Sequence, residues 1–284
     1  MNVVTRLRKF AGRYLKPNAR PRHRVADSIE RALKYLFLEM ILMEQNSLNQ
    51  YIRYIELDRD NVPSFSEYPF NLPAVKNLDR LSFHPKVTFI VGENGSGKST
   101  ILESIAVAFG FNAEGGTRNF TFSSRATHSE LNQHIKIVKG AKKPKDGFFF
   151  RAESFYNFAT NVEELKLNDA YGGRSLHEQS HGESFFAVFQ NRFSRESIYI
   201  LDEPEAALSP SRQMSMITRM HDLIKEGSQF IIATHSPIIM AYPNAIIYQI
   251  DEGFEQVRYE DTEHYQITRS FITNTQKMLD ILME

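Results

Sequence analysis

The chain has 284 residues, of which 42% are hydrophobic, so it is long and apolar enough for one large domain or two small ones with a sizeable core. It has no cysteine, which excludes a disulfide framework, a thiolate nucleophile and a Cys-ligated metal and fits a reducing compartment. The formal net charge is zero, and the longest apolar run, residues 35–43, is too short for a membrane helix and contains Glu39. We therefore expect a cytoplasmic protein with no transmembrane segment.

The N-terminal part of the chain is strongly basic. Residues 1–35 carry ten Lys/Arg and two acidic residues, a local charge of +8, and the rest of the chain sums to −8. We expect residues 1–50 to form a basic extension with a helix and residues 51–284 to form the main domain. Three interpretations of the extension stay open. It can be a solvated arm, or even the product of an upstream translation start, since Met43 precedes the first predicted strand. It can also contact nucleic acid or an acidic partner, or act as a targeting peptide. The predicted helix rests on the spacing of Val25, Ile29, Leu33, Leu36 and Met40.

The rest of the chain alternates between strand-like and helix-like segments, and no repeat of 20 to 50 residues is present. Near-continuous apolar strands that alternate with helices are typical of a largely parallel sheet covered by helices. We therefore predict an α/β fold whose functional residues follow the carboxyl ends of the strands. Strands are predicted in residues 51–57, 86–92, 145–153, 197–202, 229–235 and 245–251, and helices in residues 101–111, 183–193 and 209–227.

Two of these helices have defined faces or ends. In the helix at 183–193, the residues expected near one face are Phe185, Val188, Phe189 and Phe193. In the helix at 209–227, Ser209 suits the N-cap, Pro210 the first turn and Gly227 the end. The residues expected on its inner face are Met214, Ile217, His221 and Ile224.

Residues 92–99, GENGSGKS, satisfy the phosphate-loop pattern G-x-x-x-x-G-K-[ST] between a predicted strand and a predicted helix. Glycines in such a loop let backbone N–H groups turn inward around phosphates at a helix amino end, where the dipole favours anions. Lys98 can reach the β- and γ-phosphates, and the Ser99 hydroxyl can ligate Mg²⁺. This context disfavours an ordinary glycine turn. The predicted nucleotide-binding residues are Gly92, Glu93, Asn94, Gly95, Ser96, Gly97, Lys98, Ser99 and Thr100.

Residues 177–181 also fit the H-E-x-x-H pattern of zinc proteases, in which two histidines on one helix face hold the metal. However, Ser180 with Glu183 directly before an apolar pattern is a capping box, which places a helix start between the two histidines. Ser184 also stands where the longer zinc motif has glycine. We therefore disfavour zinc and interpret Ser180, Gly182 and Glu183 as a second anion-binding surface.

Two further strands end in polar residues. The strand at 197–202 ends in Asp202, placed to hold Mg²⁺ through water, and Glu203 follows, placed to polarise water that attacks a γ-phosphate. Charged residues close many strands, but these two follow the phosphate loop at a distance typical of such enzymes. His235 follows the next strand, where an imidazole can hydrogen-bond the γ-phosphate; a purely structural histidine is the alternative. The predicted catalytic residues are therefore Glu203, His235 and Lys98.

Together these motifs resemble the ATP-binding-cassette (ABC) ATPase superfamily, with Walker A at 92–99, the signature at Ser180–Ser184, Walker B at Ile198–Asp202, catalytic Glu203 and switch His235. GENGSGKST is similar to the loops of SMC-type and RecF-like ATPases, and DEPEAALSP to those of OLD-like ATPases. The runs EYPFNLPAVKNLD, FRAESF and YGGRSLHEQSHGES are similar to compact bacterial proteins described as AAA-family ATP-binding proteins. The resemblance implies a P-loop NTPase fold over residues 51–284: an ABC-ATPase-like, mostly parallel sheet flanked by helices, with a helical signature subdomain.

The chain departs from transporter cassettes in several positions. Its signature is Ser-His-Gly-Glu-Ser instead of Leu-Ser-Gly-Gly-Gln, and Ser209 stands where those proteins have aspartate. Glu153 is the candidate at the position of the Q-loop glutamine, and residues 100–179 are too few for the coiled coil of an SMC protein. Candidate phosphate contacts, for which salt bridging is the alternative, are Arg118, Arg125, Arg151 and Arg174, and candidate adenine-stacking residues are Tyr68 and Phe70.

The resemblance implies a soluble ATPase with ATP and Mg²⁺ as cofactors, in which ATP is sandwiched between the two subunits of an ATP-dependent homodimer. It also implies a nucleic-acid or defence-related partner. Two alternatives stay open: the ATPase subunit of a membrane transporter, and a slow ATP-gated clamp in which the nucleotide acts as a switch.

Overall fold

A computed structural model of the chain describes residues 50–118 and 129–284, all of which belong to one compact unit. The predicted basic extension, apart from Gln50, lies outside the described residues, and so does Arg125. Throughout the described part, each helix is too short or too polar to span a lipid bilayer.

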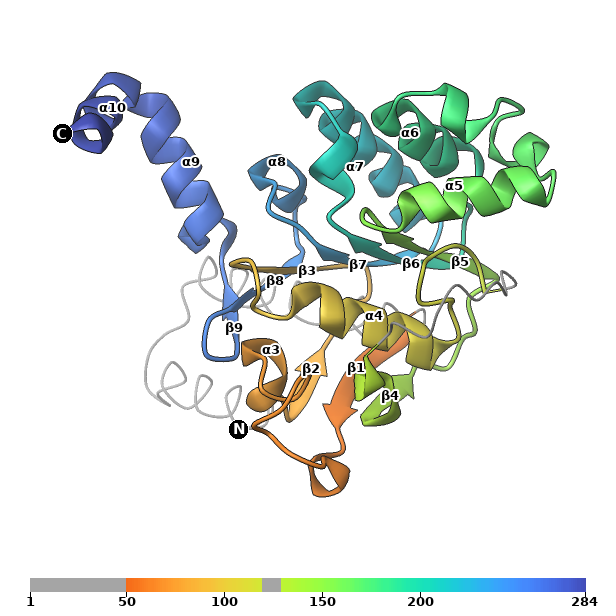
Figure 1. The fold of residues 1–284 in the computed structure, drawn as a ribbon, viewed down its shortest axis with the longest axis horizontal. Coiled ribbons are helices and arrows are strands. Elements are labelled where there is room, and N and C mark those ends of the chain that lie inside the picture. The colour runs from red at the N-terminus through yellow and green to blue at the C-terminus, as the bar shows by residue number, and fades with distance from the viewer. Residues whose placement is uncertain (1–49, 119–128) are drawn as a thin grey trace, which may run out of the picture. The chain divides into compact units, whose positions relative to one another are not determined.

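Within the described residues, a central sheet of six strands is parallel except at one edge (Figure 1). Its neighbouring pairs run parallel from β5 to β8, and only β9 is antiparallel to its neighbour. The prediction of a mostly parallel sheet is therefore confirmed, although β9 was not predicted. In spatial order the strands are β5 (Asp146–Arg151), β6 (Ser197–Asp202), β7 (Gln229–Ala233), β3 (Val87–Gly92), β8 (Ile246–Ile250) and β9 (Phe254–Val257).

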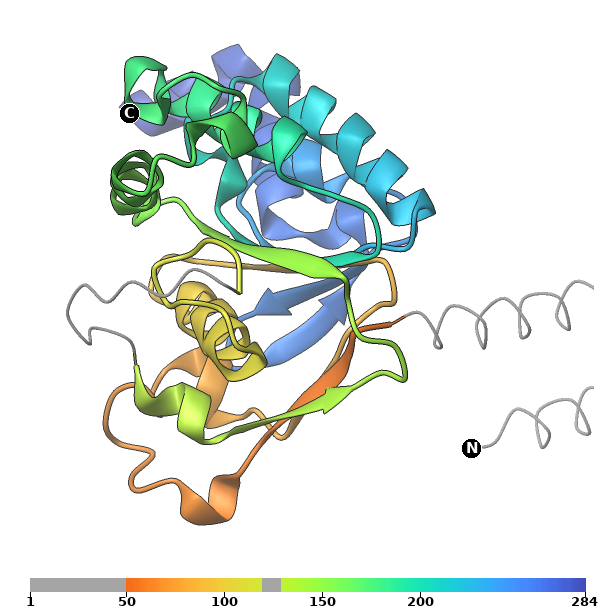
Figure 2. The same ribbon diagram turned by 90° about the vertical axis from the view of Figure 1, so that its right-hand side faces the viewer.

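A smaller antiparallel sheet of described strands lies below the central sheet in Figures 1 and 2. Its spatial order is β2 (Arg80–Ser82), β1 (Ile52–Leu57) and β4 (Ile135–Lys139). The predicted strand at 51–57 is β1, and the sequence analysis missed β2 and β4. Together with α4 this sheet encloses the second of two apolar cores.

Helices cover both faces of the central sheet (Figures 1 and 2). Side chains alternate along a strand, so Phe89 and Val91 of β3 pack beneath the helices α5 to α8, whereas Ile90 packs toward α4 and the small sheet. The longer helices are α4 (Lys98–Phe109), α5 (Phe155–Glu164), α6 (His181–Asn191), α7 (Pro210–Lys225), α9 (Glu263–Thr273) and α10 (Thr275–Met283), and two single turns are α3 (Pro73–Lys76) and α8 (Pro237–Met240). Short 3₁₀ turns are η1 (Arg59–Asn61), η2 (Glu130–Gln133), η3 (Asn168–Tyr171), η4 (Leu176–Glu178), η5 (Pro204–Ala207) and η6 (Tyr259–Asp261).

The helix predictions are confirmed in position and partly wrong in orientation. The apolar residues predicted on one face of α6 are all buried. In α7 the Ser209 side chain caps the helix by accepting from Arg212 N, and Pro210 occupies the first turn, as predicted. Of the predicted inner face, Ile224 is buried and Ile217 packs against the core, whereas Met214 and His221 are exposed; Met216, Met220 and Leu223 complete the buried stripe. Two apolar sets with helical spacing exist in this segment, and only the packing against the sheet selects between them.

Gln229, at the start of β7, ties the two sheets together. Its Oε1 accepts hydrogen bonds from the backbone N–H groups of Tyr51 and Ile52, both at 3.0 Å. Its Nε2 donates to the carbonyls of Ile52 and His84 at 2.9 and 3.0 Å. The side chain is fully buried, and all of its hydrogen-bonding capacity is used. The amide therefore fixes where β1 lies relative to the central sheet.

We predict that Gln229→Glu lowers the free energy of unfolding by about 3 kcal/mol at pH 8, measured by urea denaturation. The carboxylate removes both donors and faces two buried carbonyls, and each buried group left without a partner costs about 1–3 kcal/mol. Gln256→Glu, the same change on an exposed position of β9, is the control and should change stability by less than about 0.5 kcal/mol. Equal stability of the two variants would contradict the role of the Gln229 amide.

Candidate active site

The carboxyl ends of four neighbouring parallel strands meet at one edge of the central sheet. Across this edge, Arg151, Asp202, Ala233 and Ile90 are register partners on β5, β6, β7 and β3. Each strand is followed directly by a predicted site segment. The sheet thus gathers residues that are more than a hundred positions apart in the sequence.

The predicted phosphate loop connects β3 to α4. Gly97 has a φ of 99°, and a Cβ there would lie 3.1 Å from the Cβ of Ala74, so both the backbone conformation and the space favour glycine. The Lys98 ammonium is buried and donates to the carbonyls of Gly92 at 2.7 Å and Glu93 at 2.9 Å. Burial lowers the pKa of Lys98, against the opposing effect of nearby carboxylates such as Glu203. A bound phosphate would give this buried ammonium a negatively charged partner in place of two neutral carbonyls.

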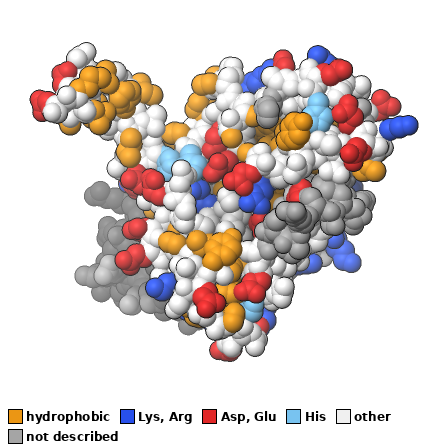
Figure 3. Space-filling view, viewed as in Figure 1, with side chains coloured by type: hydrophobic (Ala, Val, Ile, Leu, Met, Phe, Trp, Pro, Cys, Tyr) orange, Lys and Arg blue, Asp and Glu red, His pale blue; other side chains and the backbone are white. Residues whose placement is uncertain are grey.

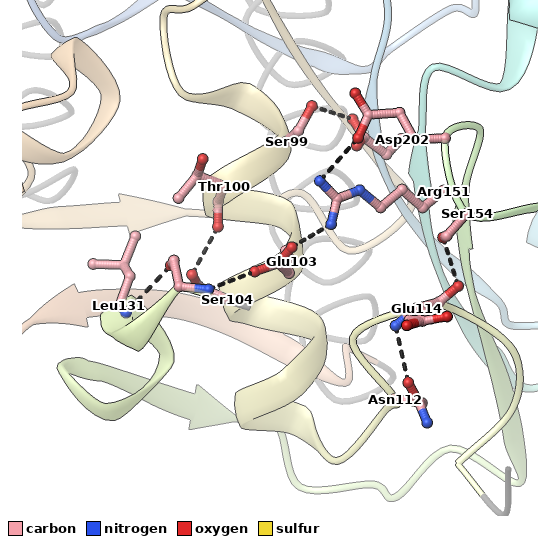
Figure 4. Close-up of polar contacts among 12 residues, drawn as sticks. Ser99, Thr100, Glu103, Ser104, Asn112, Glu114, Leu131, Arg151, Ser154 and Asp202 are labelled. Atoms are coloured by element: carbon pink, nitrogen blue, oxygen red, sulfur yellow. Dashed lines mark hydrogen bonds and ion pairs between the residues drawn. The ribbon is translucent and has the colours of Figure 1, made fainter. Parts of the chain in front are cut away.

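Ser99 and Asp202 lie side by side across the site. The Ser99 hydroxyl donates to Asp202 Oδ1 at 3.1 Å (Figure 4). Asp202 is buried, and this burial raises its pKa to about 7 despite the hydrogen bond from Ser99 and the charge of Arg151. A hydroxyl and a carboxylate are oxygen ligands of the kind that Mg²⁺ binds. Because the hydroxyl and the buried carboxylate lie next to each other, this pair of oxygen donors fits a divalent cation.

Arg151 is engaged in salt bridges beside this pair. Its guanidinium pairs with the Glu103 carboxylate of α4 (Figure 4), and it also pairs with the Glu153 carboxylate at 3.1 Å. Glu103 in turn accepts from Ser129 N at 3.1 Å. For Arg151 the salt-bridging alternative is therefore the observed one, and Glu153 lies with a largely exposed side chain at the end of β5.

The other candidate side chains from the sequence have varied surroundings. Arg174 donates to the Glu178 carbonyl at 3.0 Å, and the Arg118 guanidinium lies 5.3 Å from the centre of the Phe109 ring. Phe70 is buried in the core, which removes it as an adenine-stacking candidate, whereas Tyr68 is exposed.

Glu203 and His235 form the second half of the site. Glu203 has a φ of 50°, a left-handed conformation that is strained for a residue with a Cβ, and its N–H donates to the Ala233 carbonyl at 3.0 Å. Its Oε1 lies 3.5 Å from His235 Nε2. The His235 backbone N–H donates to the carboxylate of Glu205, whose pKa is raised by burial. The strand ends thus bring the two predicted catalytic side chains into contact.

His264 is a site residue that the sequence analysis missed. It comes from the first turn of α9, and its Nε2 lies 2.7 Å from His235 Nδ1. Figure 3 shows histidine side chains at the base of the projecting α9 and α10, next to a group of acidic side chains. His264 belongs to no motif, so the sequence held no signal for it. Glu205, by contrast, lies within the DEPE run and was overlooked as a site residue.

The predicted capping box at the start of α6 is confirmed. Ser180 Oγ accepts from Glu183 N at 3.4 Å, and Glu183 Oε2 accepts from Ser180 N at 3.0 Å. Glu183 Oε1 also lies 3.7 Å from Arg212. The carboxylate of Glu183 therefore occupies the anion position of this helix terminus, and its pKa is lowered by the hydrogen bonds from Ser180.

Gly182 seats α6 on the loop that follows Glu203. A Cβ at Gly182 would lie 2.3 Å from the carbonyl oxygen of Ala207, so only glycine allows this approach. α6 lies on the opposite face of the central sheet from α4 (Figure 1). Hence Ser180 and Lys98 belong to different layers of the fold.

The two histidines of the H-E-x-x-H pattern lie on separate elements. His177 is in η4, with Nε2 3.1 Å from Thr160 Oγ1, and α6 starts only at His181. They therefore do not share one helix face, as the zinc-protease motif requires. Over the described residues, the structure has no group of three or more His, Asp or Glu side chains arranged to hold a metal.

The chain matches one protein-family model and is similar to the ATP-binding proteins of several transporters. The AAA_23 family model, described as an AAA domain, matches residues 60–276. The xylose import ATP-binding protein XylG of Thermoanaerobacter pseudethanolicus is 24% identical over 186 residues, which cover 57% of this chain and 37% of that protein. The energy-coupling factor transporter ATP-binding protein EcfA of Methanosphaera stadtmanae is 27% identical over 194 residues, or 59% of this chain and 66% of the relative. The chain therefore spans about a third of the first relative and just under two thirds of the second.

Among solved structures, cbiO1 from Clostridium perfringens, part of the ABC transporter complex cbiONQ, aligns with a TM-score of 0.45 and 18% identity. The alignment covers 82% of this chain and 99% of that one.

We predict that Asp202→Asn stabilises the nucleotide-free protein at pH 8. The folded-state pKa of about 7 exceeds the ordinary value of 3.8, so ionisation of Asp202 costs folding free energy; the cost is absent well below pH 3.8, grows with pH and is complete above pH 7. In EDTA we expect a gain of about 2–4 kcal/mol at pH 8 and less than half of it at pH 5, measured by urea denaturation. Asp222→Asn, on an exposed position of α7, is the control. A gain that is equal at both pH values would contradict the burial of this charge.

Proposed function

The chain belongs to this AAA-domain family and has the fold of an ABC-type P-loop ATPase, and from that premise we propose that it binds MgATP at residues 92–99 and hydrolyses it. Members of the ABC ATPase family hydrolyse ATP. The observation that carries the proposal is the meeting of Lys98, the Ser99–Asp202 pair and the Glu203–His235 pair at one sheet edge. These are the side chains that phosphoryl transfer to water needs.

Each residue has a defined task in this proposal. Lys98 exchanges its bonds with the loop carbonyls for bonds to the β- and γ-phosphates, while backbone N–H groups of the loop surround the phosphates. Ser99 and Asp202 are the residues that would hold Mg²⁺, which when bound offsets the charge of the phosphates. Glu203 orients the attacking water and accepts its proton. His235 Nε2 faces Glu203 at 3.5 Å, and when nucleotide is bound the Nε2–H would donate to a γ-phosphate oxygen beside Glu203.

We predict that Glu203→Gln keeps ATP binding, measured by calorimetry, and lowers single-turnover hydrolysis at least about 100-fold. The amide keeps the size of the side chain but cannot accept a proton as the carboxylate does. Glu255→Gln, on an exposed position of β9, should leave both measurements unchanged. Hydrolysis by Glu203→Gln at the wild-type rate would move the catalytic base to another residue.

We propose further that two copies of the chain sandwich ATP, with Ser180 and Gly182 of one copy facing the phosphates bound by the other. Two observations support this: Ser180 opens α6 in the layer opposite α4, and it caps a helix amino end that favours an anion. The Glu183 carboxylate now occupies that amino end, with Arg212 beside it. In the dimer, the phosphate bound by the other copy competes with the Glu183 carboxylate for this helix terminus. A rotation of the Glu183 side chain toward Arg212 would relieve the repulsion between the two anions.

We predict that Lys98→Ala and Ser180→Arg are each inactive alone but recover ATP hydrolysis when mixed. The Lys98→Ala copy cannot bind phosphate at its own loop, but its α6 terminus is intact. The Ser180→Arg copy has an intact loop, but the bulky, charged side chain blocks its α6 terminus. One of the two composite sites in the mixed dimer is then intact, so the turnover should approach half of the wild-type value per dimer. Absence of recovery in a confirmed heterodimer would exclude a shared site.

The proposed partner is a nucleic acid or a defence-related protein, an assignment supported by the similarity of the GENGSGKST and DEPEAALSP segments to soluble ATPases. A transporter subunit is the second candidate, favoured by the relatives that are named as import or transporter ATP-binding proteins. Affinity purification separates the two, because a permease supports only the second. We also propose that residues 1–50 form an extension separate from the ATPase domain. The start of the family match at residue 60 supports this division.

A further inference from the structure

His264 and His235 form a close pair of imidazole rings beside the proposed catalytic base. The ring centres are 4.8 Å apart, and the 2.7 Å between His235 Nδ1 and His264 Nε2 is a hydrogen-bond distance. The opposite nitrogen of His235, Nε2, is buried without a hydrogen bond and faces Glu203 Oε1 at 3.5 Å. His235 therefore contacts Glu203 through one ring nitrogen and His264 through the other.

The start of α9 is hydrogen-bonded to the segment after His235 and to β8. The backbone of His264 is therefore held by contacts other than those of its own side chain. Thr262, the residue before α9, is fully buried and donates from Oγ1 to the Tyr259 carbonyl at 2.8 Å. The Tyr259 hydroxyl donates to the carbonyl of Pro237, two residues after His235, at 2.8 Å. The Glu263 N–H donates to the Gln249 side chain of β8 at 3.2 Å. These bonds hold the backbone at the start of α9, from which the His264 side chain reaches His235.

A hydrogen bond between two neutral imidazoles needs one N–H and one lone pair. If His235 donated from Nδ1, its Nε2 would present a lone pair to the Glu203 carboxylate, and two acceptors would face each other. If His264 donates from Nε2 instead, His235 carries its proton on Nε2, where it points at Glu203. The second arrangement replaces this repulsion with attraction. Burial, as the largest effect, lowers the pKa of both histidines, in keeping with two neutral rings.

We propose that His264 is a positioning residue that holds His235 in the Nε2–H tautomer, with that proton directed toward Glu203. The proposed tautomer and orientation of the His235 ring rest on the geometry alone. Its consequence for catalysis rests on the proposed function, because only the Nε2–H tautomer can donate a hydrogen bond to a γ-phosphate oxygen. His264 itself touches neither nucleotide nor water in this scheme and acts through His235.

The direct test is the tautomer of His235 in nucleotide-free, full-length protein, read from two-bond ¹H–¹⁵N correlations of ¹⁵N-histidine-labelled samples. His235→Gln identifies the signal by its loss. We expect the Nε2–H tautomer in the wild type and a mixture of tautomers in His264→Ala. An Nδ1–H tautomer in the wild type, or an unchanged His235 signal in His264→Ala, would overturn the proposal. This readout requires no ATPase activity, so it stays decisive even if the proposed function is wrong.

Steady-state kinetics test the consequence. His264→Ala should lower kcat about 10- to 100-fold with the KM for ATP unchanged, as expected when the partner that orients a working imidazole is lost. His264→Gln, whose amide can donate near the position of Nε2, should recover part of kcat and of the Nε2–H signal. His221→Ala, which removes another histidine, bonded to the Tyr242 hydroxyl, is the matched control and should leave kcat unchanged.

A purely structural role for His264 gives a different pattern. It predicts a lower melting temperature for His264→Ala with kcat and KM unchanged in the fraction that remains folded. It also predicts that His264→Gln behaves no better than His264→Ala in kcat once both are folded. Either result, with the His235 tautomer unaltered, would refute the positioning role.

Discussion

The geometry of the site depends on the negative charge that β6 delivers to the sheet edge. Asp202, Glu203 and Glu205 stand within four residues, and burial raises the pKa of the first and the third. Lys98 and Arg151 lie near, but Lys98 is bonded to carbonyls of its own loop and Arg151 to Glu103 and Glu153. Both cations thus already have other partners, and a divalent cation bound with its nucleotide would pair with carboxylates that the fold buries.

The strand order explains how distant residues share this edge. β7 lies between β3, which leads into the phosphate loop, and β6, which ends in the acidic residues. Ser99 on α4 reaches across to Asp202, and His235, which follows β7, lies 3.5 Å from Glu203. The residue that follows the middle strand can therefore contact the segment after β6, and in the proposed function it also faces the phosphate loop.

The sequence predicted the central strands, α4, α6, α7 and the capping box, because each is specified by local apolar runs, glycines or caps. It missed the short strands β2 and β4 and the helix α5, and it missed β9, α9 and α10, whose side chains, apolar ones such as Ile281 included, are largely exposed. The motif residues were found because the spacing within each motif is local; the structure brings the phosphate loop and the ends of β6 and β7 to one sheet edge, whereas Ser180 lies in another layer. The contact of His264 with His235 could not be predicted, since it depends on where α9 starts relative to β7. The Gln229 amide escaped notice for the same reason: its partners are about 145 to 178 positions away along the chain.

The start of α6 packs directly against the loop behind Glu203, because at Gly182 only a residue without a Cβ can approach the Ala207 carbonyl this closely. In a dimer of the proposed kind, α6 would touch the nucleotide of the neighbour while that loop serves the copy's own nucleotide. The occupancy of one site would then alter the free energy of the other, and by thermodynamic linkage the effect must be equal in both directions. Two ATP molecules on such a dimer would bind cooperatively, and the sign and size of their coupling would be set at a contact that only glycine permits.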